Sequence, residues 1–133
     1  MFSVGVSDYC MVAHSLADPT FGPAQRLHGA TYTVDVEVHS RAIGGHNVVM
    51  DLAALRDVVH RVLEPINYRN LDEHPAFVGR MSTSERLAEY LAEMIVDAIG
   101  ELPEEARPTE PASLRLRLHE SPNAWAGCDR PIP

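Results

Sequence analysis

Residues 26–38 alternate between apolar and polar side chains, and this pattern constrains the fold more than any other feature. One face carries His28, Ala30, Tyr32, Val34, Val36 and Val38. The other face carries Thr31, Thr33, Asp35 and Glu37, and the alternation continues to His39. A period of two over this length predicts a long antiparallel strand with one buried face and one solvated face.

Two histidines stand at the ends of predicted strands. His28 opens the alternating strand, and His14 closes an earlier strand over residues 2–14. Either histidine alone is more often a hydrogen-bonded core residue than a ligand. The turn signals Asp18-Pro19 and Gly22-Pro23 separate the two strands. If the strands pair through this turn, both imidazoles meet at one end of a sheet, which favours a joint site.

The rest of the chain predicts two helices and two more strands. Asp51 is a candidate N-cap before a helical apolar pattern that ends at Pro65. The segment 82–85 reads Ser-Thr-Ser-Glu, a capping box with the acid three residues after the cap, before a second apolar stripe. A third strand runs from Leu114 to Glu120, and residues 123–128 could return as a fourth. Between the helices, residues 66–82 form a long irregular stretch of the kind that is often functional.

This order predicts a single α+β domain over residues 1–133. We expect a four-stranded antiparallel sheet with both helices on one face. The outer strands would keep unpaired edges, which favour strand addition by other copies.

Composition excludes several classes of function. All eleven basic residues are arginine, so chemistry that needs a lysine Schiff base is excluded. The net charge of −8 disfavours nucleic acid and anionic membranes as partners. The sequence shows no apolar run of membrane-spanning length and no leader-like segment. With only two cysteines, we expect a cytoplasmic protein whose thiols are reduced.

Several motifs together resemble one enzyme family. They are His14, Leu27-His28-Gly29, Val49-Met50-Asp51, Thr83-Ser84-Glu85 with Leu87-Ala88, and Glu120-Ser121-Pro122. Over nearly the whole chain they resemble the 6-pyruvoyl-tetrahydropterin synthase and 6-carboxytetrahydropterin synthase family. The resemblance implies the tunnelling fold (T-fold), in which sheets of several subunits join into an oligomeric barrel with active sites between subunits. We therefore expect a homo-oligomer, a trimer or a hexamer, that acts on a small-molecule substrate.

The resemblance also implies roles for individual residues. It places a catalytic zinc on His14 and His28, and substrate binding on Glu120 and Thr83. The family's second motif histidine is replaced by Ala30, so the third metal ligand is missing. A catalytic zinc normally takes three protein ligands. Zinc would therefore bind weakly unless His46, Glu73, His74 or another subunit contributes.

The catalytic positions depart from the family as well. The family's cysteine is absent from residues 22–26, and its Asp/His pair reads Asn67-Tyr68. Tyr68 and His74 are the candidate catalytic residues that remain, although a loop tyrosine usually packs and a histidine before proline is often a surface residue. Glu120 could likewise be a solvent-facing strand end.

Three hypotheses follow. The leading one is a divergent lyase or cyclase that acts on a small heterocyclic or polyketide-like substrate in specialised metabolism. The second is a non-catalytic subunit that binds pterin or purine. The third is an ordinary synthase with relocated catalytic residues.

Overall fold

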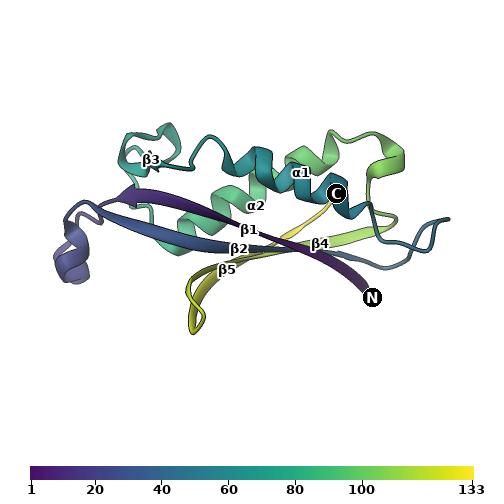
Figure 1. Ribbon diagram of the computed structural model, residues 1–133, viewed down its shortest axis with the longest axis horizontal. Helices are drawn as coiled ribbons and strands as arrows, with labels where there is room; N and C mark the ends of the chain where they lie inside the picture. The colour runs from purple at the N-terminus through teal and green to yellow at the C-terminus, as the bar shows by residue number, and fades with distance from the viewer.

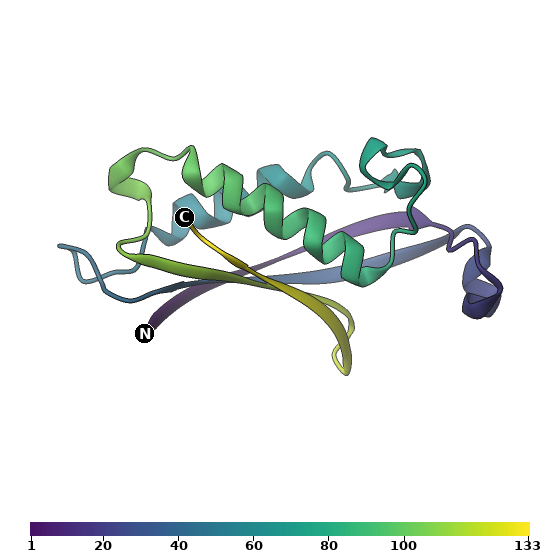
Figure 2. The same cartoon turned by 180° about the vertical axis from the view of Figure 1, so that it is seen from behind.

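One sheet and two long helices make up the computed structural model, which describes residues 1–133 (Figure 1). The strands are β1 (Phe2–His14), β2 (His28–Ser40), β3 (Arg69–Asn70), β4 (Pro111–Ser121) and β5 (Ala124–Pro131). They lie in the order β3-β1-β2-β4-β5. Helices α1 (Leu52–Leu63) and α2 (Ser84–Gly100) both cover the same face of the sheet, and the other face is open (Figures 1 and 2).

The β1–β2 hairpin is the longest paired unit of the sheet. Its antiparallel register runs without a shift from Phe2 opposite Ser40 to His14 opposite His28. The predicted parity of β2 is confirmed, because Val34, Val36 and Val38 are fully buried. The leucines of β4 continue this buried face on the other side of β2.

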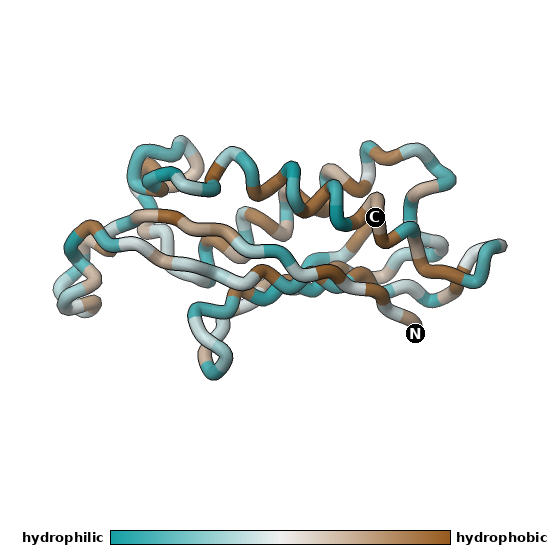
Figure 3. The backbone as a smooth tube through the Cα atoms, in the orientation of Figure 1, coloured by the Kyte–Doolittle hydropathy of each residue, from teal (hydrophilic) through white to brown (hydrophobic).

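The core lies between the sheet and the two helices. The helices contribute Leu55, Val58, Val59 and Leu63 from α1, and Leu87, Leu91, Ile95 and Ile99 from α2, none more than 2% exposed. Apolar residues recur along both helices and alternate with polar ones along the strands (Figure 3). Burying one such aliphatic side chain stabilises the fold by about 1.5–3 kcal/mol. Neither α1 nor α2 combines the length and the hydropathy that a membrane-spanning helix needs.

Side-chain caps fix where the two helices begin. Asp51 accepts a hydrogen bond from the Ala53 N–H at 2.9 Å, so the predicted cap of α1 is confirmed. Helix α2 is capped by Thr83, whose Oγ1 accepts from the Arg86 N–H at 3.3 Å. The capping-box spacing predicted Ser82 as this cap, and that prediction is wrong by one residue. Both the carbonyl and the hydroxyl group of Ser82 contact His14 instead.

The α+β architecture with both helices on one face is confirmed, but the predicted strand count of four is wrong. The fifth strand, β3, pairs in parallel with Val12 and Ala13 on the outer edge of β1. With only two residues, β3 is too short to show an alternating pattern in the sequence. The same loop contains two short 3₁₀ turns, Leu71–Glu73 and Pro75–Phe77, so residues 66–82 are ordered around β3.

Candidate functional site

A pocket of about 610 Å³ opens where the β1–β2 hairpin ends and α2 begins. The residues that line it include His14, His28, Thr83 and Glu120. Each comes from a different element or cap: β1 ends in His14, β2 begins with His28, and Glu120 is near the end of β4. The two histidines meet at one end of the sheet, and Glu120 lines the same pocket. The chemical roles of these residues remain predictions.

The two imidazoles form a close pair with defined tautomers. His14 and His28 are opposite each other in the register, and their ring centroids are 4.6 Å apart. Nδ1 of His14 lies 2.9 Å from the Ser82 carbonyl oxygen, and Nδ1 of His28 lies 2.8 Å from that of Arg26. A carbonyl can only accept, so each Nδ1 carries a hydrogen, and in the neutral form of either ring the lone pair is on Nε2.

The environment of His14 favours its neutral form. The side chain is only 4% exposed. Burial is the main cause that lowers the pKa of His14; the hydrogen bond to Ser82 opposes it, and nearby His28 lowers the pKa further. At neutral pH, Nε2 of His14 is therefore a base or a metal ligand rather than an acid.

The residues present do not complete a catalytic zinc site. An Nδ1–H bonded to a carbonyl is the usual support behind a metal-ligating histidine, so His14 and His28 each suit a metal ion. Ala30 lines the same pocket, and its methyl group cannot act as a ligand. Nowhere in the chain do three or more His, Cys, Asp or Glu side chains form a group that could hold a metal. His46 lies beyond the opposite end of β2. Two ligands fall short of the three that a catalytic zinc normally takes.

Glu120 is held in place from the protein side. Its Oε1 accepts a hydrogen bond from Ser84 Oγ at 2.6 Å, and Ser84 Oγ is also 3.2 Å from the Tyr32 hydroxyl. Oε2 has no hydrogen-bond partner within the chain and is free to accept from a ligand. Tyr32 and Ser84 also line the pocket and are site residues that were not predicted. Parity had placed Tyr32 on the face of His28, but as an apolar core position.

Thr83 lines the pocket and is also the N-cap of α2. Its Oγ1 accepts the capping hydrogen bond from Arg86 N–H. The hydroxyl hydrogen remains available to donate to a ligand. Substrate binding by Thr83 remains a prediction.

Tyr68 does not line this pocket within one chain. It lies on the outer edge of β1, where its N–H donates to the Met11 carbonyl oxygen at 2.7 Å. The side chain is 68% exposed, and the backbone has a positive φ of 59°. The preceding residue, Asn67, accepts from the Met11 N–H at 2.9 Å through Oδ1. Both residues that replace the family's catalytic pair are therefore tied to β1 and lie outside the pocket.

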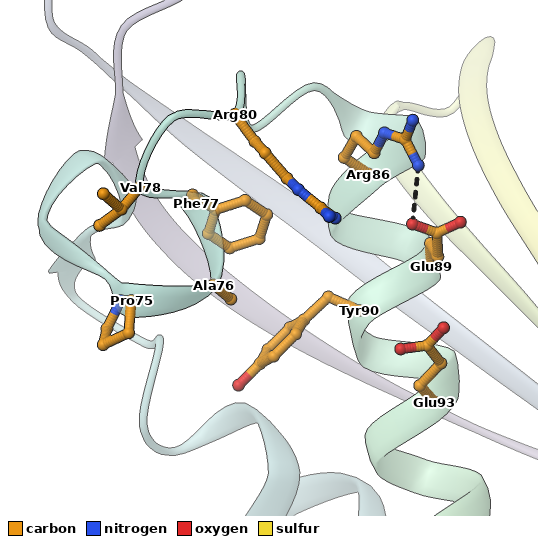
Figure 4. A pocket seen from close by; sticks show the side chains of 9 residues that line it. All are labelled: Pro75, Ala76, Phe77, Val78, Arg80, Arg86, Glu89, Tyr90 and Glu93. Atoms are coloured by element: carbon orange, nitrogen blue, oxygen red, sulfur yellow. Dashed lines mark hydrogen bonds and ion pairs between the residues drawn. The ribbon is translucent and has the colours of Figure 1, made fainter.

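His74 also lies outside the histidine pocket. Its ring is 5.8 Å from Phe77 and 5.4 Å from Tyr90, centroid to centroid, and its Nδ1 accepts from the Ala76 N–H. Phe77 and Tyr90 line a separate pocket of about 370 Å³. Figure 4 shows their rings beside Arg80, with Arg86 bonded to Glu89 on α2. His74 therefore supports this aromatic cluster.

Cys10 is the one cysteine near the site, and it is a buried thiol. It is fully buried in β1 opposite Tyr32. Burial, with a smaller effect of Asp8, raises the pKa of Cys10 to about 11. A thiol in that state is a poor nucleophile and base, so Cys10 does not replace the missing family cysteine.

Comparison with known proteins supports the family that the sequence motifs indicated. The sequence model of the 6-pyruvoyl tetrahydropterin synthase family matches residues 4–131. The human 6-pyruvoyl tetrahydrobiopterin synthase is 35% identical over 66 residues, which cover 48% of this chain and 46% of that protein. The protein of that name from Pongo abelii matches equally well. The chain thus spans about half the length of the curated relatives it matches.

Solved structures share the whole fold. The 6-pyruvoyl tetrahydropterin synthase of Caenorhabditis elegans aligns with a TM-score of 0.78 and 23% identity, over 97% of this chain and 95% of that one. A catalytic-residue mutant of the Plasmodium vivax synthase aligns with a TM-score of 0.76 and 17% identity, over 98% of both chains. At these identities the likeness shows the fold alone, and it confirms the predicted T-fold. With the match over residues 4–131, it follows that this chain belongs to the 6-pyruvoyl tetrahydropterin synthase family.

Proposed function

We propose that this protein is a divergent lyase or cyclase of the pterin-synthase type that acts on a small heterocyclic or polyketide-like substrate. One observation carries the proposal: the Glu120 carboxylate and the imidazoles of His14 and His28 line the same pocket. Glu120 is fixed through Oε1, and Oε2 is free. Nε2 of His14 and Nε2 of His28 have no hydrogen-bond partner within the chain, and burial favours the neutral form of His14.

Glu120 is the proposed substrate anchor. A flat heterocycle with adjacent N–H donors can bond to Oε2 and to the remaining lone pair of Oε1. Such charge-assisted hydrogen bonds contribute roughly 1.5–3 kcal/mol each. The hydroxyl hydrogen of Thr83 can donate to a carbonyl on the same ring.

The histidine pair is the proposed acid–base group. The lone pair on Nε2 of His14 or His28 can accept a proton from the bound substrate, and the resulting imidazolium can return it at another atom. A positioned acid or base of this kind contributes roughly 10²–10⁴-fold to a rate. Since the third metal ligand is absent, the proposal contains no metal-dependent step. The lost family residues favour a reaction in specialised metabolism over the standard pterin pathway.

Assembly is part of the proposal. The outer edge of β1 is paired only near its end, and β5 has no outer neighbour. We propose that copies of the chain pair through these edges as a trimer or hexamer. Tyr68 projects from this edge and would then face a neighbouring copy, where it could serve as a proton donor.

A non-catalytic pterin-binding or purine-binding subunit is the second candidate. Two observations favour it: Ala30 occupies the third ligand position, and Tyr68 lies outside the pocket. Under this reading the Glu120 anchor is kept while the catalytic groups are lost.

Glu120→Gln tests the anchor, with Glu73→Gln as a matched control on an exposed loop. The probe is pterin (2-amino-4-oxopteridine), and binding is followed by its fluorescence. We expect Glu120→Gln to weaken binding by at least about tenfold, because one charge-assisted hydrogen bond is lost. Unfolding temperature should be unchanged. Equal affinity in the parent and in Glu120→Gln would contradict the proposed anchor.

Turnover separates the two candidates. Parent protein is incubated with 7,8-dihydroneopterin triphosphate and with heterocyclic metabolites of neighbouring pathways, and products are followed by mass. We expect little product from the triphosphate and turnover of another substrate. Tight binding without any turnover would favour the non-catalytic subunit. Turnover of the triphosphate at the rate of an authentic synthase would favour relocated catalytic residues.

A further inference from the structure

A hydrogen-bonded chain of three side chains connects the core to the pocket. It begins at Tyr32 in β2, passes through Ser84 at the start of α2, and ends at Glu120 in β4. The two oxygen–oxygen distances are 3.2 Å and 2.6 Å. Tyr32 is 1% exposed and Ser84 is 9% exposed, so both hydroxyl groups are largely shielded from water.

The direction of this chain follows from the number of available hydrogens. An ionised carboxylate only accepts, so the single hydrogen of Ser84 points to Oε1 of Glu120. The Ser84 oxygen can then only accept from Tyr32, whose phenolic hydrogen points to it. The order of donation is Tyr32 to Ser84 to Glu120. Burial raises the pKa of Tyr32, the hydrogen bond with Ser84 lowers it, and the charge of Glu120 raises it further. The net increase keeps Tyr32 protonated as a donor.

The three consecutive residues at the start of α2, Ser82 to Ser84, each form a different polar contact. Ser82 contacts Nδ1 of His14 through its carbonyl and hydroxyl oxygens. Thr83 caps the helix. Ser84 has no capping role, and its hydroxyl is directed to Glu120. One turn of chain therefore orients both the histidine pair and the carboxylate.

We infer that Tyr32 and Ser84 are positioning residues that hold the Glu120 carboxylate with Oε2 presented to the ligand. This inference rests on the proposed function, in which Glu120 anchors the substrate. Tyr32 and Ser84 both line the pocket, and their inferred role is to orient Glu120 through the two hydrogen bonds. The phenolic oxygen is otherwise unnecessary, because a buried phenylalanine would fill the same core space without the cost of burying a hydroxyl group.

The test uses small side-chain changes in the full chain. Tyr32→Phe removes only the first donor, and Ser84→Ala removes the link. Ser84→Thr keeps a hydroxyl group at the same position. Tyr90→Phe is the matched control, since this tyrosine lies in the separate pocket of Figure 4. Affinity for pterin is measured for each variant by fluorescence, and folding is checked by thermal unfolding.

We expect graded losses of affinity. A hydrogen bond to a charged group contributes more than one between neutral groups. Tyr32→Phe should therefore weaken pterin binding about three- to tenfold, and Ser84→Ala about tenfold or more. Ser84→Thr and Tyr90→Phe should bind as the parent does. In the Ser84→Ala background, Tyr32→Phe should have no further effect, because the link is already broken.

The outcomes distinguish this inference from the function on which it rests. Loss of binding in Glu120→Gln, with parental affinity in Ser84→Ala and Tyr32→Phe, would overturn the inference and leave the anchor intact. Additive losses in the double variant would also overturn it, since a general packing defect adds. Parental affinity in Glu120→Gln would contradict the anchor itself.

A second measurement needs no ligand. The NMR chemical shift of the Glu120 carboxyl carbon reports the hydrogen bond that it accepts. We expect it to move in Ser84→Ala and, by a smaller amount, in Tyr32→Phe, and to stay constant in Tyr90→Phe. An unchanged shift in both of the first two variants would overturn the inference.

Discussion

The histidine pocket and the loop between the helices use polar side chains in opposite ways. In the pocket, one end of each polar group is bonded to the protein and the other end is free. Nδ1 of His14 and of His28 meets a carbonyl oxygen, and Oε1 of Glu120 meets a hydroxyl group. The other nitrogen or oxygen of each group has no hydrogen-bond partner within the chain, and all three residues line the pocket.

The polar groups of the loop serve its own structure. Asn67 bonds the edge of β1, and Asp72 accepts from both the N–H and the hydroxyl of Ser15, at 3.1 and 2.5 Å. His74 accepts from the backbone of Ala76. A titratable side chain is therefore a better functional candidate when one of its polar atoms remains free after its structural hydrogen bonds are made.

The largest expected effect concerns the metal position of the pocket. Ala30→His should add a third imidazole beside His14 and His28, because residue 30 lines the same pocket. We expect zinc affinity to rise by at least about tenfold. Calorimetric titration with zinc is the measurement, and Ala124→His on exposed β5 is the control. No gain over that control would show that the two histidines cannot chelate a common ion.

A smaller effect is expected from the loop. Asp72→Ala removes both hydrogen bonds to Ser15 and should lower the free energy of unfolding by about 1–2 kcal/mol. Pterin affinity should not change, because Asp72 does not line the histidine pocket. Chemical denaturation and fluorescence titration measure the two quantities. Glu73→Ala, which removes an adjacent carboxylate without a hydrogen bond, controls for charge. If Asp72→Ala lowered pterin affinity without lowering the free energy of unfolding, the loop would take part in binding and the proposed difference between the two regions would be wrong.

Tyr68 allows a still smaller test of the loop. Its positive φ is unfavourable for a tyrosine, and asparagine tolerates this conformation better. Tyr68→Asn should therefore stabilise the fold by up to about 1 kcal/mol. If Tyr68 donates a proton in an assembled site, the same variant loses turnover while gaining stability. Equal turnover by the parent and by Tyr68→Asn would show that Tyr68 has a packing role and no catalytic one.

The smallest effect is expected at Cys10. Because its pKa is raised to about 11, almost no thiolate forms near neutral pH, and reactivity should increase only as pH approaches that value. A thiol reagent in mildly alkaline buffer should therefore label the half-buried Cys128 first, as seen by peptide mass. Cys10→Ala should leave pterin affinity and turnover at parental values. Preferential labelling of Cys10 would show that it is exposed to the pocket.

Alternation along the strands was enough to predict much of the fold and part of the site. Parity placed His28 on the buried face of its strand, and the turn after His14 paired the two strands. The Ser84–Glu120 bond could not be predicted in this way, because it depends on how far α2 lies over the sheet. The positive φ of Tyr68 and the two-residue strand β3 follow from contacts with β1 that leave no periodic signal.

The way in which β1 ends has a further consequence for its exposed edge. Both backbone groups of Met11 point outward, to Asn67 and to Tyr68. Because direction alternates along a strand, the odd-numbered residues before it also point outward. The N–H of Tyr9 is bonded to Asp8 Oδ1 at 2.7 Å, whereas Gly5 and Ser7 have no backbone neighbour on that side.

Because this edge is exposed, deuterium uptake by the backbone amides of β1 can report whether copies of the chain have assembled. In a separate chain, the amides of Gly5 and Ser7 exchange with solvent rapidly, while those of Val4 and Val6 face β2 and exchange slowly. Strand addition from another copy would slow the odd-numbered amides to the rate of the even-numbered ones. Alternating fast and slow amide exchange along the first half of β1 would identify unassembled protein. Loss of this alternation at higher protein concentration would show that the interface between copies includes this edge.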